Sequence, residues 1–372
     1  MYDFNFSYLQ VKRPYPKDNL LKPALEPSTF HIDYEQWQEE LERFQAEPEE
    51  KRQEQTVFKQ TREFIIQSMS QILPQRNWTL SFDILGLRER CGRRYPFLTS
   101  AKIKKRLLTR RNTDALKNKI LLSGLHKKFR KTFRAKPGHR IIDWDLNRAH
   151  FTFLGNIAND EALIKAAKSD PHTYTGNLFG STVTDLEERR NLGKRINSAI
   201  ISGCTAKWLI RELRSNGIQM HWDDVQTGLD LWWERYPEAL AYKKAHHDMI
   251  SKKQQMSQKH TLMVGKRHLY HFDQSTLNGK NNNIETWPKT IEGRKLKAQR
   301  SAFSVELRAH EAYLMDFVFS IAHQHGMQLI LPMYDGAMWQ IPEDMNLDPF
   351  KADIDSLLEE FNFTSGFSIK EL

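Results

Sequence analysis

Ile141-Ile142-Asp143-Trp144-Asp145 is a strand-like apolar run that ends in an aspartate, and Leu329-Ile330-Leu331-Pro332-Met333-Tyr334-Asp335 has the same design much later in the chain. Between them, Arg190-Asn191-Leu192-Gly193-Lys194 sets two cations four residues apart, which places both on one face of a helix. Strand-end carboxylates can hold two divalent metal ions once the fold brings them together, and a cationic helix face can bind a triphosphate. The combination predicts nucleotidyl transfer.

The composition is that of a polar, folded protein with no sign of secretion. The 372 residues are 39% hydrophobic and 11% aromatic, enough for a large core or for two to three subdomains. No stretch approaches the roughly 20 apolar residues of a membrane helix, and Met1-Tyr2-Asp3-Phe4 does not begin a signal peptide. The two cysteines, Cys91 and Cys204, favour a reducing compartment and are too few for a zinc site of their own. We therefore expect a cytoplasmic protein.

Positive charge is concentrated in one segment. Residues 101–140 contain fifteen Lys and Arg and a single acid, Asp114, whereas the formal charge of the whole chain is +10. A basic block of this kind is typical of a polyanion partner, although charge runs are often only solvated surface. Apolar residues at helical spacing, Ile103, Leu107 and Leu108, indicate that the block folds. Nucleic acid is the favoured partner.

Periodicity and turn residues predict a mixed α+β chain. We expect helices over 34–72 with a break at Pro48, over 149–157 and 160–168, from Pro171, over 187–214 with a possible break at Gly203, over 222–253 with an interruption near Pro237, and over 295–324 and 349–361. Strands are expected over 140–145, 328–333 and 337–341, with a strand or hairpin over 260–269 and a surface loop over 271–293. Residues 1–30 should be irregular, because four prolines interrupt them.

Each aspartate alone also has an ordinary structural reading. Asp335-Gly336 between apolar strands is a common hairpin turn, and Asp145 could simply cap a helix. Asp143 competes with Asp145 for a functional role, since both lie on the same strand face. Other motifs in the sequence are needed to decide whether these aspartates have a catalytic or a structural role.

In order along about residues 110–340, the sequence resembles the family-A DNA polymerases, the bacterial DNA polymerase I group. Asp145-Leu146-Asn147-Arg148-Ala149-His150 stands where that family has Asp-Tyr-Ser-Gln-Ile-Glu, with Asp160 at matching spacing, and Arg190 to Asn197 is similar to the Arg-x-x-x-Lys-x-Ile-Asn of its fingers helix. Met333-Tyr334-Asp335-Gly336 resembles Val-His-Asp-Glu. Further similar segments are Thr113 to Asn118, Phe133 to Gly138, Asp170 to Thr173, Leu178 to Gly180, Glu234 to Pro237, and Thr261 to Tyr270. The spacing of Phe133-x-Ala135 and of Asp160 favours Asp145 over Asp143.

The departures from the family pattern are specific. Gly336 replaces the family's second hairpin acid, and His150 replaces the Glu that blocks a ribose 2′-hydroxyl. The two aromatic positions of the fingers helix are Ser198 and Ser202, and Arg300, Ser304 and Arg308 stand where the family has Arg, Asn and Gln. These changes leave the metal and phosphate residues in place but alter the positions for sugar discrimination and template stacking.

The resemblance implies a role for each motif residue. Asp145 and Asp335 would hold two Mg²⁺ ions, with Mn²⁺ as a possible substitute, and Arg190, Lys194 and His172 would bind the triphosphate, with Lys194 also protonating pyrophosphate. His150, Ser198 and Ser202 would lie at the nucleotide. Primer–template DNA would be bound by Arg110, Arg111, Lys117, Asn118, Arg130, Arg267, Arg300, Ser304 and Arg308.

We therefore expect a right-hand polymerase that has an antiparallel palm sheet, helical fingers and a reduced helical thumb. The expected division is 1–100 as N-terminal extension and thumb-like helices, 101–170 as basic segment and first palm part, 171–255 as fingers, and 256–372 as second palm part. The expected reaction adds dNMP to a primer 3′-hydroxyl. Because Asp145 lies so early, we expect no proofreading, as in a compact phage, plasmid or other mobile-element enzyme. The alternatives are a primase or RNA polymerase on the same fold, and an inactive polymerase-like replication initiator.

Overall fold

The computed structural model describes residues 13–26, 28–54, 60–73, 79–80, 83–84, 96–98, 120–215, 217–255, 260–264, 267–272 and 291–372. The chain divides into two compact units, each of which is described by itself: one comprises Met1–Lys12, Asn147–Leu314 and Leu357–Gly366, and the other comprises Arg13–Leu146, Met315–Ser356 and Phe367–Leu372. We call them the helical unit and the sheet unit. Arg110, Arg111, Lys117 and Asn118 lie outside the described residues, as does the rest of 101–119 of the predicted basic block.

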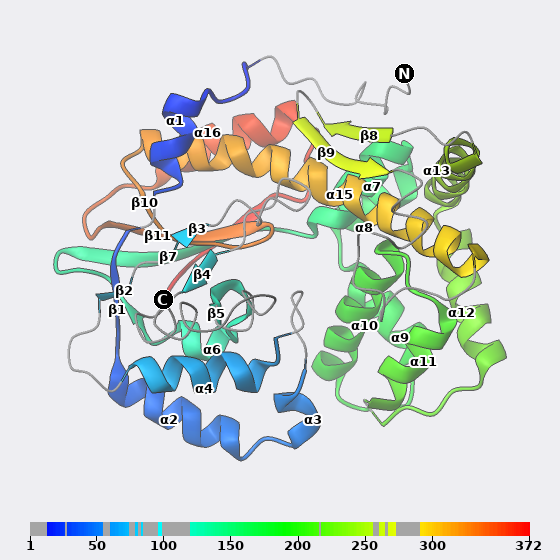
Figure 1. Cartoon of the computed structure of the whole chain (residues 1–372), viewed down its shortest axis with the longest axis horizontal. Coiled ribbons are helices and arrows are strands. Elements are labelled where there is room, and N and C mark those ends of the chain that lie inside the picture. Colours follow the sequence, from blue (N-terminus) through cyan, green and yellow to red (C-terminus); the bar gives the residue numbers. More distant parts are fainter. Residues whose placement is uncertain are drawn as a thin grey trace, which may run out of the picture. The chain divides into compact units, whose positions relative to one another are not determined.

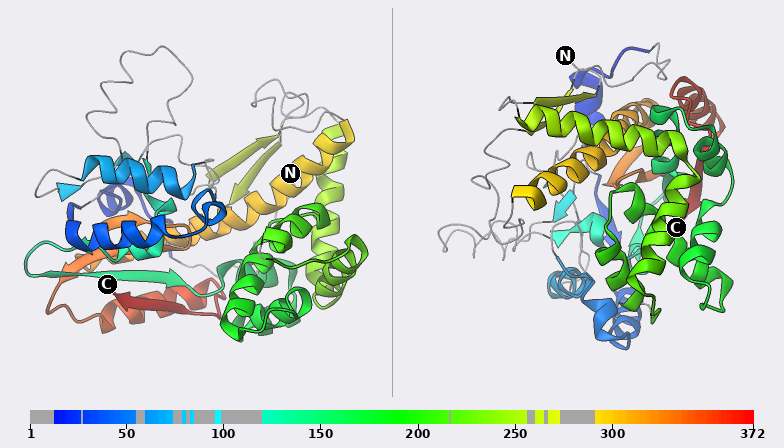
Figure 2. Two further views of the ribbon diagram at one scale, coloured as in Figure 1. Left: turned by 90° about the horizontal axis from the view of Figure 1, so that it is seen from below. Right: turned by 90° about the vertical axis from the view of Figure 1, so that its right-hand side faces the viewer.

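A four-stranded antiparallel sheet organises the sheet unit (Figure 1). Its order is β10-β11-β7-β12, formed by Gln328–Pro332, Gly336–Pro342, His139–Leu146 and Phe367–Glu371. The predicted strands at 140–145, 328–333 and 337–341 are confirmed. β12 was not predicted; it pairs along the free side of β7, beside which it runs in the left view of Figure 2. The strand that carries Asp145 is therefore a central strand of the sheet.

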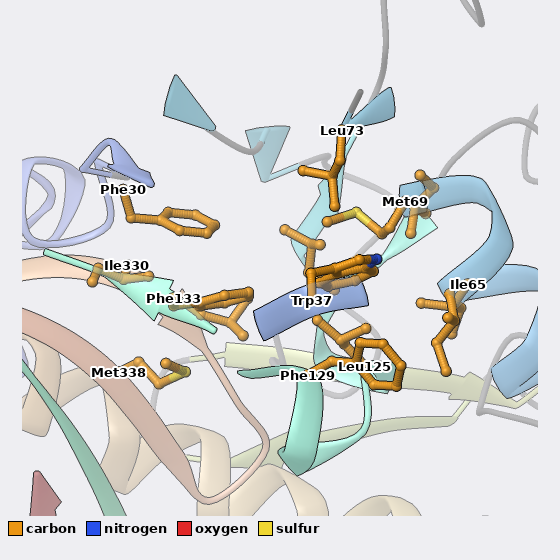
Figure 3. Packing of buried hydrophobic residues seen from close by; sticks show 14 of the residues in the cluster. Phe30, Trp37, Ile65, Met69, Leu73, Leu125, Phe129, Phe133, Ile330 and Met338 are labelled. Carbon is orange, nitrogen blue, oxygen red and sulfur yellow. The ribbon is translucent and has the colours of Figure 1, made fainter. Parts of the chain in front are cut away.

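The two faces of this sheet are covered by different elements. On one face, Trp144 lies 5.9 Å from Trp339, ring centre to ring centre, and Trp339 packs on Phe319 of α15 (Ile291–Gln324) and on Phe350 of α16 (Asp348–Glu360). On the opposite face, Ile141 and Met338 join an apolar core that includes Trp37, Phe129 and Phe133 (Figure 3). Burial on both faces fixes the register of β7, because a slip of one residue would exchange its two sets of side chains.

The N-terminal part of the sheet unit supplies most of that second core. Trp37 lies on α2 (Tyr34–Gln45), Ile65 and Met69 lie on α4 (Arg62–Ile72), and all three are fully buried (Figure 3). The helical pattern predicted over 34–72 is confirmed for α2, for the short helix α3 (Glu49–Arg52) after Pro48, and for α4. It is wrong in allowing a break only at Pro48, because α3 ends at Arg52 and α4 begins after its N-cap Thr61. The prediction of an irregular segment up to residue 30 is wrong. α1 (Asp18–Ala24) forms there and tolerates Pro23 close to its end, where Leu21 and Ala24 are buried, and β1 (Phe30–Ile32) begins at residue 30.

Short strands and turns complete the sheet unit. β1 pairs with β2 (Thr79–Leu80) and with β6 (Phe133–Arg134), while β3 (Asp83–Ile84), β4 (Pro96–Leu98) and β5 (Ile120–Leu121) form a second small sheet. The single turn of 3-10 helix η2 (Leu122–Gly124) and the short helix α6 (Lys127–Arg130) follow β5. Arg130, the last residue of α6, contacts Met333 and interacts electrostatically with Asp143 and Asp145 of β7.

Helices dominate the other unit. Its described helices are α7 (Ala149–Ala158), α8 (Glu161–Lys168), α9 (Pro171–Phe179), α10 (Leu186–Ile201), α11 (Ala206–Ser215), α12 (Trp222–Glu234) and α13 (Pro237–Gln255), with the first part of α15. Gly203 has a φ of 83°, so the predicted break between α10 and α11 is confirmed at a residue that tolerates left-handed backbone. The hairpin near Gly265 is also confirmed, as β8 (His260–Val264) and β9 (Arg267–Phe272). No described helix is long and apolar enough to cross a membrane.

Candidate active site

The two predicted aspartates lie together at one end of the sheet. Asp145 is opposite Gly336 in the pairing of β7 with β11, and Gly336 directly follows Asp335. The main-chain N–H of Leu146 donates a hydrogen bond of 2.8 Å to the carbonyl oxygen of Asp335, and the N–H of Met333 closes the turn by donating to the carbonyl of Gly336 at 2.9 Å. Both aspartates are half-buried. The segments that carry the two aspartates, 190 residues apart in the chain, are thus joined by backbone hydrogen bonds.

Gly336 is where the structure departs most clearly from the hairpin Asp-Glu pattern. A β-carbon on Gly336 would lie 2.5 Å from the carbonyl oxygen of Trp144 and 2.8 Å from Oδ1 of Asp145. The carboxylate of Asp145 could move aside, but the carbonyl of Trp144 is backbone and could make room only by a shift of the strands. The backbone of β11 therefore approaches β7 too closely for a second acid at this position.

The donor set at this edge suits a hard divalent cation. Among the described residues, no group of three or more His, Cys, Asp or Glu side chains is arranged to hold a metal ion. Mg²⁺ is commonly bound through one or two carboxylates together with waters and substrate phosphates, so a complete protein cage is not needed. Asp145 and Asp335 supply the oxygen ligands that such an ion requires, and they fit it.

Asp143 occupies a different environment from Asp145, although both are on one face of β7. Asp143 pairs with Met338 on β11 and with Lys370 on β12, two residues back from the strand end. Burial raises the pKa of its carboxyl, while Arg130 and Lys370 oppose that shift. The structure thus places Asp145, rather than Asp143, next to the turn that carries Asp335.

In the helical unit, two glycines bring α9 and α10 into close contact (Figure 1). A β-carbon on Gly193 of α10 would collide with the carbonyl oxygen of His172 and would lie 2.6 Å from the backbone nitrogen of Gly176. A β-carbon on Gly176 of α9 would in turn collide with the carbonyl oxygen of Arg189. This approach puts His172, on the first turn of α9, beside the cationic face of α10.

The predicted triphosphate residues are therefore neighbours. Arg190 and Lys194 both act on His172 electrostatically, and with burial, the largest cause, they lower the pKa of its imidazole to about 4. Nε of Arg190 lies 3.0 Å from Oδ2 of Asp170, the N-cap of α9. Burial disfavours the ionised form of Asp170, but hydrogen bonds from Thr173 and Arg190 outweigh it and lower the pKa of that carboxyl. Lys194 is exposed.

A residue without a predicted role, Asn197, fixes the tautomer of His172. The indole N–H of Trp232 donates to Oδ1 of Asn197 at 2.8 Å and the hydroxyl of Thr175 donates to the same oxygen at 2.7 Å, so the amide nitrogen must face the other way. That nitrogen lies 3.0 Å from Nδ1 of His172 and donates to it. At neutral pH the proton of His172 is therefore on Nε2. The only sequence signal was the position of Asn197, three residues after Lys194 on the same helix face.

At the position of the family's Glu, His150 has an imidazole instead of a carboxylate, and this ring pairs with the carboxylate of Glu311. Nε2 of His150 lies 3.3 Å from Oε2 of Glu311 on α15; the side chain of His150 is 25% exposed and that of Glu311 is fully buried. Ser198 is exposed on α10, and Ser202 caps the end of that helix. Glu311 could not be assigned a partner from the sequence, because 161 residues separate it from His150.

The predicted DNA-binding residues fall into different settings. Ser304 is buried at 7% exposure, and Arg308 is half-buried. Arg267 and Arg300 lie on β9 and α15, and their side chains are outside what the structure describes. Arg130 is partly buried among the acids of β7. DNA binding by these residues stays a prediction.

Comparison with known proteins points to one family. The DNA polymerase I of Caldicellulosiruptor bescii is 31% identical over 120 residues, which cover 31% of this chain and 14% of that protein. Those of Thermus filiformis and Chloroflexus aurantiacus are 23% and 25% identical, over 62% and 63% of this chain and 26% and 23% of those proteins. The polymerase domain of Pol1 from M. smegmatis, solved with DNA primer–template and dNTP, has a TM-score of 0.51 and 12% identity over 83% of this chain and 49% of that chain. The chain is similar in sequence to these DNA polymerases I and shares the fold of a DNA polymerase domain.

Two facts define the extent of this similarity. No protein-family profile matches the chain, and the chain spans about a quarter or less of the length of these curated relatives. The right-hand fold class with an antiparallel palm sheet is confirmed, and the sheet β10-β11-β7-β12 carries both aspartates as predicted. The predicted boundaries at 100, 170 and 255 stay a prediction.

Proposed function

We propose that the chain is a template-directed DNA polymerase that adds dNMP to a primer 3′-hydroxyl and releases pyrophosphate. The observation that supports this most is the backbone bonding of Leu146 to Asp335, which sets Asp145 and Asp335 at neighbouring strand ends. Phosphoryl transfer requires positioning and charge stabilisation far more than covalent help from the protein. A pair of carboxylates and a cationic helix meet that requirement.

Asp145 and Asp335 would hold two Mg²⁺ ions, or Mn²⁺ in their place. When bound, such ions activate the attacking hydroxyl and stabilise the leaving pyrophosphate. The carboxylates would supply oxygen ligands from a rigid sheet, because the backbone bonds of the hairpin fix the ends of β7 and β11. The close approach at Gly336 leaves the pair without a third acid from the hairpin.

The helical unit would supply the triphosphate contacts. Arg190 can bind phosphate oxygens with two N–H groups, which requires exchange of its ion pair with Asp170 for the substrate. Lys194, one turn further, is an exposed point charge and, by the resemblance, the proton donor to pyrophosphate. His172 is neutral and would donate a hydrogen bond from Nε2, since Asn197 occupies Nδ1.

The substrates follow from the same comparison. The solved neighbour is named as a complex with DNA primer–template and dNTP, and we extend both substrates to this chain as part of the proposal. The basic block at 101–140 would track the DNA backbone through phosphate contacts that carry no sequence information. Ser198 and Ser202 would line the nucleotide side of α10 in place of aromatic residues.

Primer extension on one template, with dNTPs and NTPs in separate reactions and with and without a primer, tests the proposal. We expect extension that needs primer and dNTPs. A strong preference for NTPs would favour the alternative of an RNA-polymerase-like enzyme. That alternative is supported by His150, whose ring pairs with Glu311. By the resemblance, His150 occupies the position of the Glu that blocks a ribose 2′-hydroxyl. A primer with a mismatched 3′ end should not be shortened if the core lacks proofreading.

A further inference from the structure

Arg130 links the two segments that carry the paired aspartates. It ends α6, and its Nη1 contacts the sulfur of Met333. Met333 belongs to the closed turn before Asp335, since its N–H donates to the carbonyl of Gly336. A residue from a short basic helix therefore touches the turn of one proposed metal ligand.

The guanidinium also interacts with the acids of β7. Burial, the largest effect, lowers the pKa of Arg130, and both Asp143 and Asp145 oppose that shift. Arg130 is likewise the first of the cations that stabilise the ionised form of Asp143 against burial. The attraction is therefore mutual, between one cation and two carboxylates on the same strand face.

Each of the two charged groups keeps one atom unpaired. Within the described part of the chain, Nε of Arg130 and Oδ1 of Asp143 are buried atoms without a hydrogen-bond partner. An unpaired buried atom of a charged group is costly unless an opposite charge lies near, so the electrostatic attraction between Arg130 and Asp143 stabilises both. Such an arrangement is more typical of a functional site than of a structural ion pair.

We propose that Arg130 is the compensating cation of the carboxylate edge: it offsets the charge of Asp143 and Asp145 in the metal-free protein and so weakens the affinity of the edge for divalent ions. A guanidinium serves this purpose well because it remains charged when partly buried. Weaker metal binding would let the ions enter mainly with the nucleotide, whose phosphates add further negative charge. This inference rests on the proposed function in taking Asp145 and Asp335 as metal ligands.

Binding of Mn²⁺ alone, followed by electron paramagnetic resonance without nucleotide or DNA, tests the proposal in the full chain. Arg130→Met should tighten Mn²⁺ binding by roughly tenfold, because a unit charge near a divalent ion in a partly buried site acts strongly. Arg130→Lys, which keeps the charge, should stay within about twofold of the unchanged protein. Asp143→Asn should weaken binding, and the double variant should return close to the starting affinity.

Arg134 offers a matched control, because it is in the same segment but pairs with Asp33 at 2.9 Å and is 44% exposed. Arg134→Met makes the same change in net charge and should leave Mn²⁺ affinity nearly unaltered. Equal effects of the Arg130 and Arg134 substitutions, or weaker binding by Arg130→Met, would overturn the proposal. Arg130→Gln, with the same expectation, serves if Arg130→Met does not fold.

The failure of this inference differs from the failure of the proposed function. The proposed metal site is wrong if the unchanged protein binds no Mn²⁺. It is also wrong if Asp145→Asn and Asp335→Asn leave the Mn²⁺ affinity unaltered. Arg130 is then judged by urea unfolding in chelator, where the destabilisations caused by Arg130→Met and Asp143→Asn should be non-additive. Additive effects there would contradict the inference.

Discussion

Asp145 and Gly336 face each other across β7 and β11 so closely that a β-carbon on Gly336 would lie 2.8 Å from Oδ1 of Asp145. This contact explains how an Asp-Gly turn can carry one of the two proposed metal ligands and yet exclude a second acid. The backbone takes the space that the family's Glu side chain would need.

Gly336→Ala should therefore disturb both the fold and the site. The added methyl group must push against the carbonyl of Trp144 and the carboxylate of Asp145, so we expect the free energy of unfolding to fall by about 1–3 kcal/mol and primer extension to slow. Urea unfolding and extension rates measure the two effects. Gly138→Ala is the control: Gly138 has a φ of 72° and open space around it, so only stability should fall, by about 1 kcal/mol.

Gly193→Ala should separate α9 from α10. No β-carbon fits against the carbonyl of His172, so the helices must move apart or the substitution must unfold the unit locally. We expect a loss of about 2–4 kcal/mol of stability and a higher KM for dNTP. Asn191→Ala, at an exposed position of the same helix, should change neither quantity much. An unaltered KM in Gly193→Ala would argue that this helix contact does not position the triphosphate residues.

Asn197→Asp should change the protonation of His172. An aspartate has no N–H to donate, so Nδ1 of His172 must carry a proton to keep the contact, and the pKa of the imidazole should rise from about 4. NMR titration of the histidine measures the shift directly. Asn197→Ala removes the contact without adding charge and should leave the pKa low. A pKa that stays near 4 in Asn197→Asp would contradict the assigned tautomer.

Acid should destabilise the helical unit through two histidines. Burial, the first cause, lowers the pKa of both His172 and His310 to about 4, below the ordinary value of 6.5. Between these values the unfolded chain binds more protons than the folded one, so the free energy of unfolding falls as the pH drops from 6.5 to 4, by up to roughly 3 kcal/mol per histidine. Urea unfolding at pH 7.5 and 5 tests this. His310→Gln should flatten the dependence, whereas the exposed His221→Gln should not.

The strands that carry the aspartates could be predicted because their apolar runs are continuous and end at turn residues. β12 could not, since Phe367–Glu371 is short, partly exposed and becomes a strand only by pairing with β7. α1 was missed because proline normally ends a helix, but burial of Leu21 and Ala24 outweighs that cost over seven residues. Arg130 was predicted to contact DNA as part of the basic block, and only the tertiary fold shows its electrostatic interaction with Asp143. Glu311 and Asn197 act through contacts that no local pattern encodes.

Primer extension by Asp145→Asn and Asp335→Asn tests the central claim most directly, with the exposed Asp344→Asn as control. If the two carboxylates share one metal centre, each single variant and the double variant should lose activity by a similar factor of about a thousand or more, while the folded structure and DNA binding persist. The control should extend primers normally. Activity within a few-fold of normal in either single variant would contradict the account.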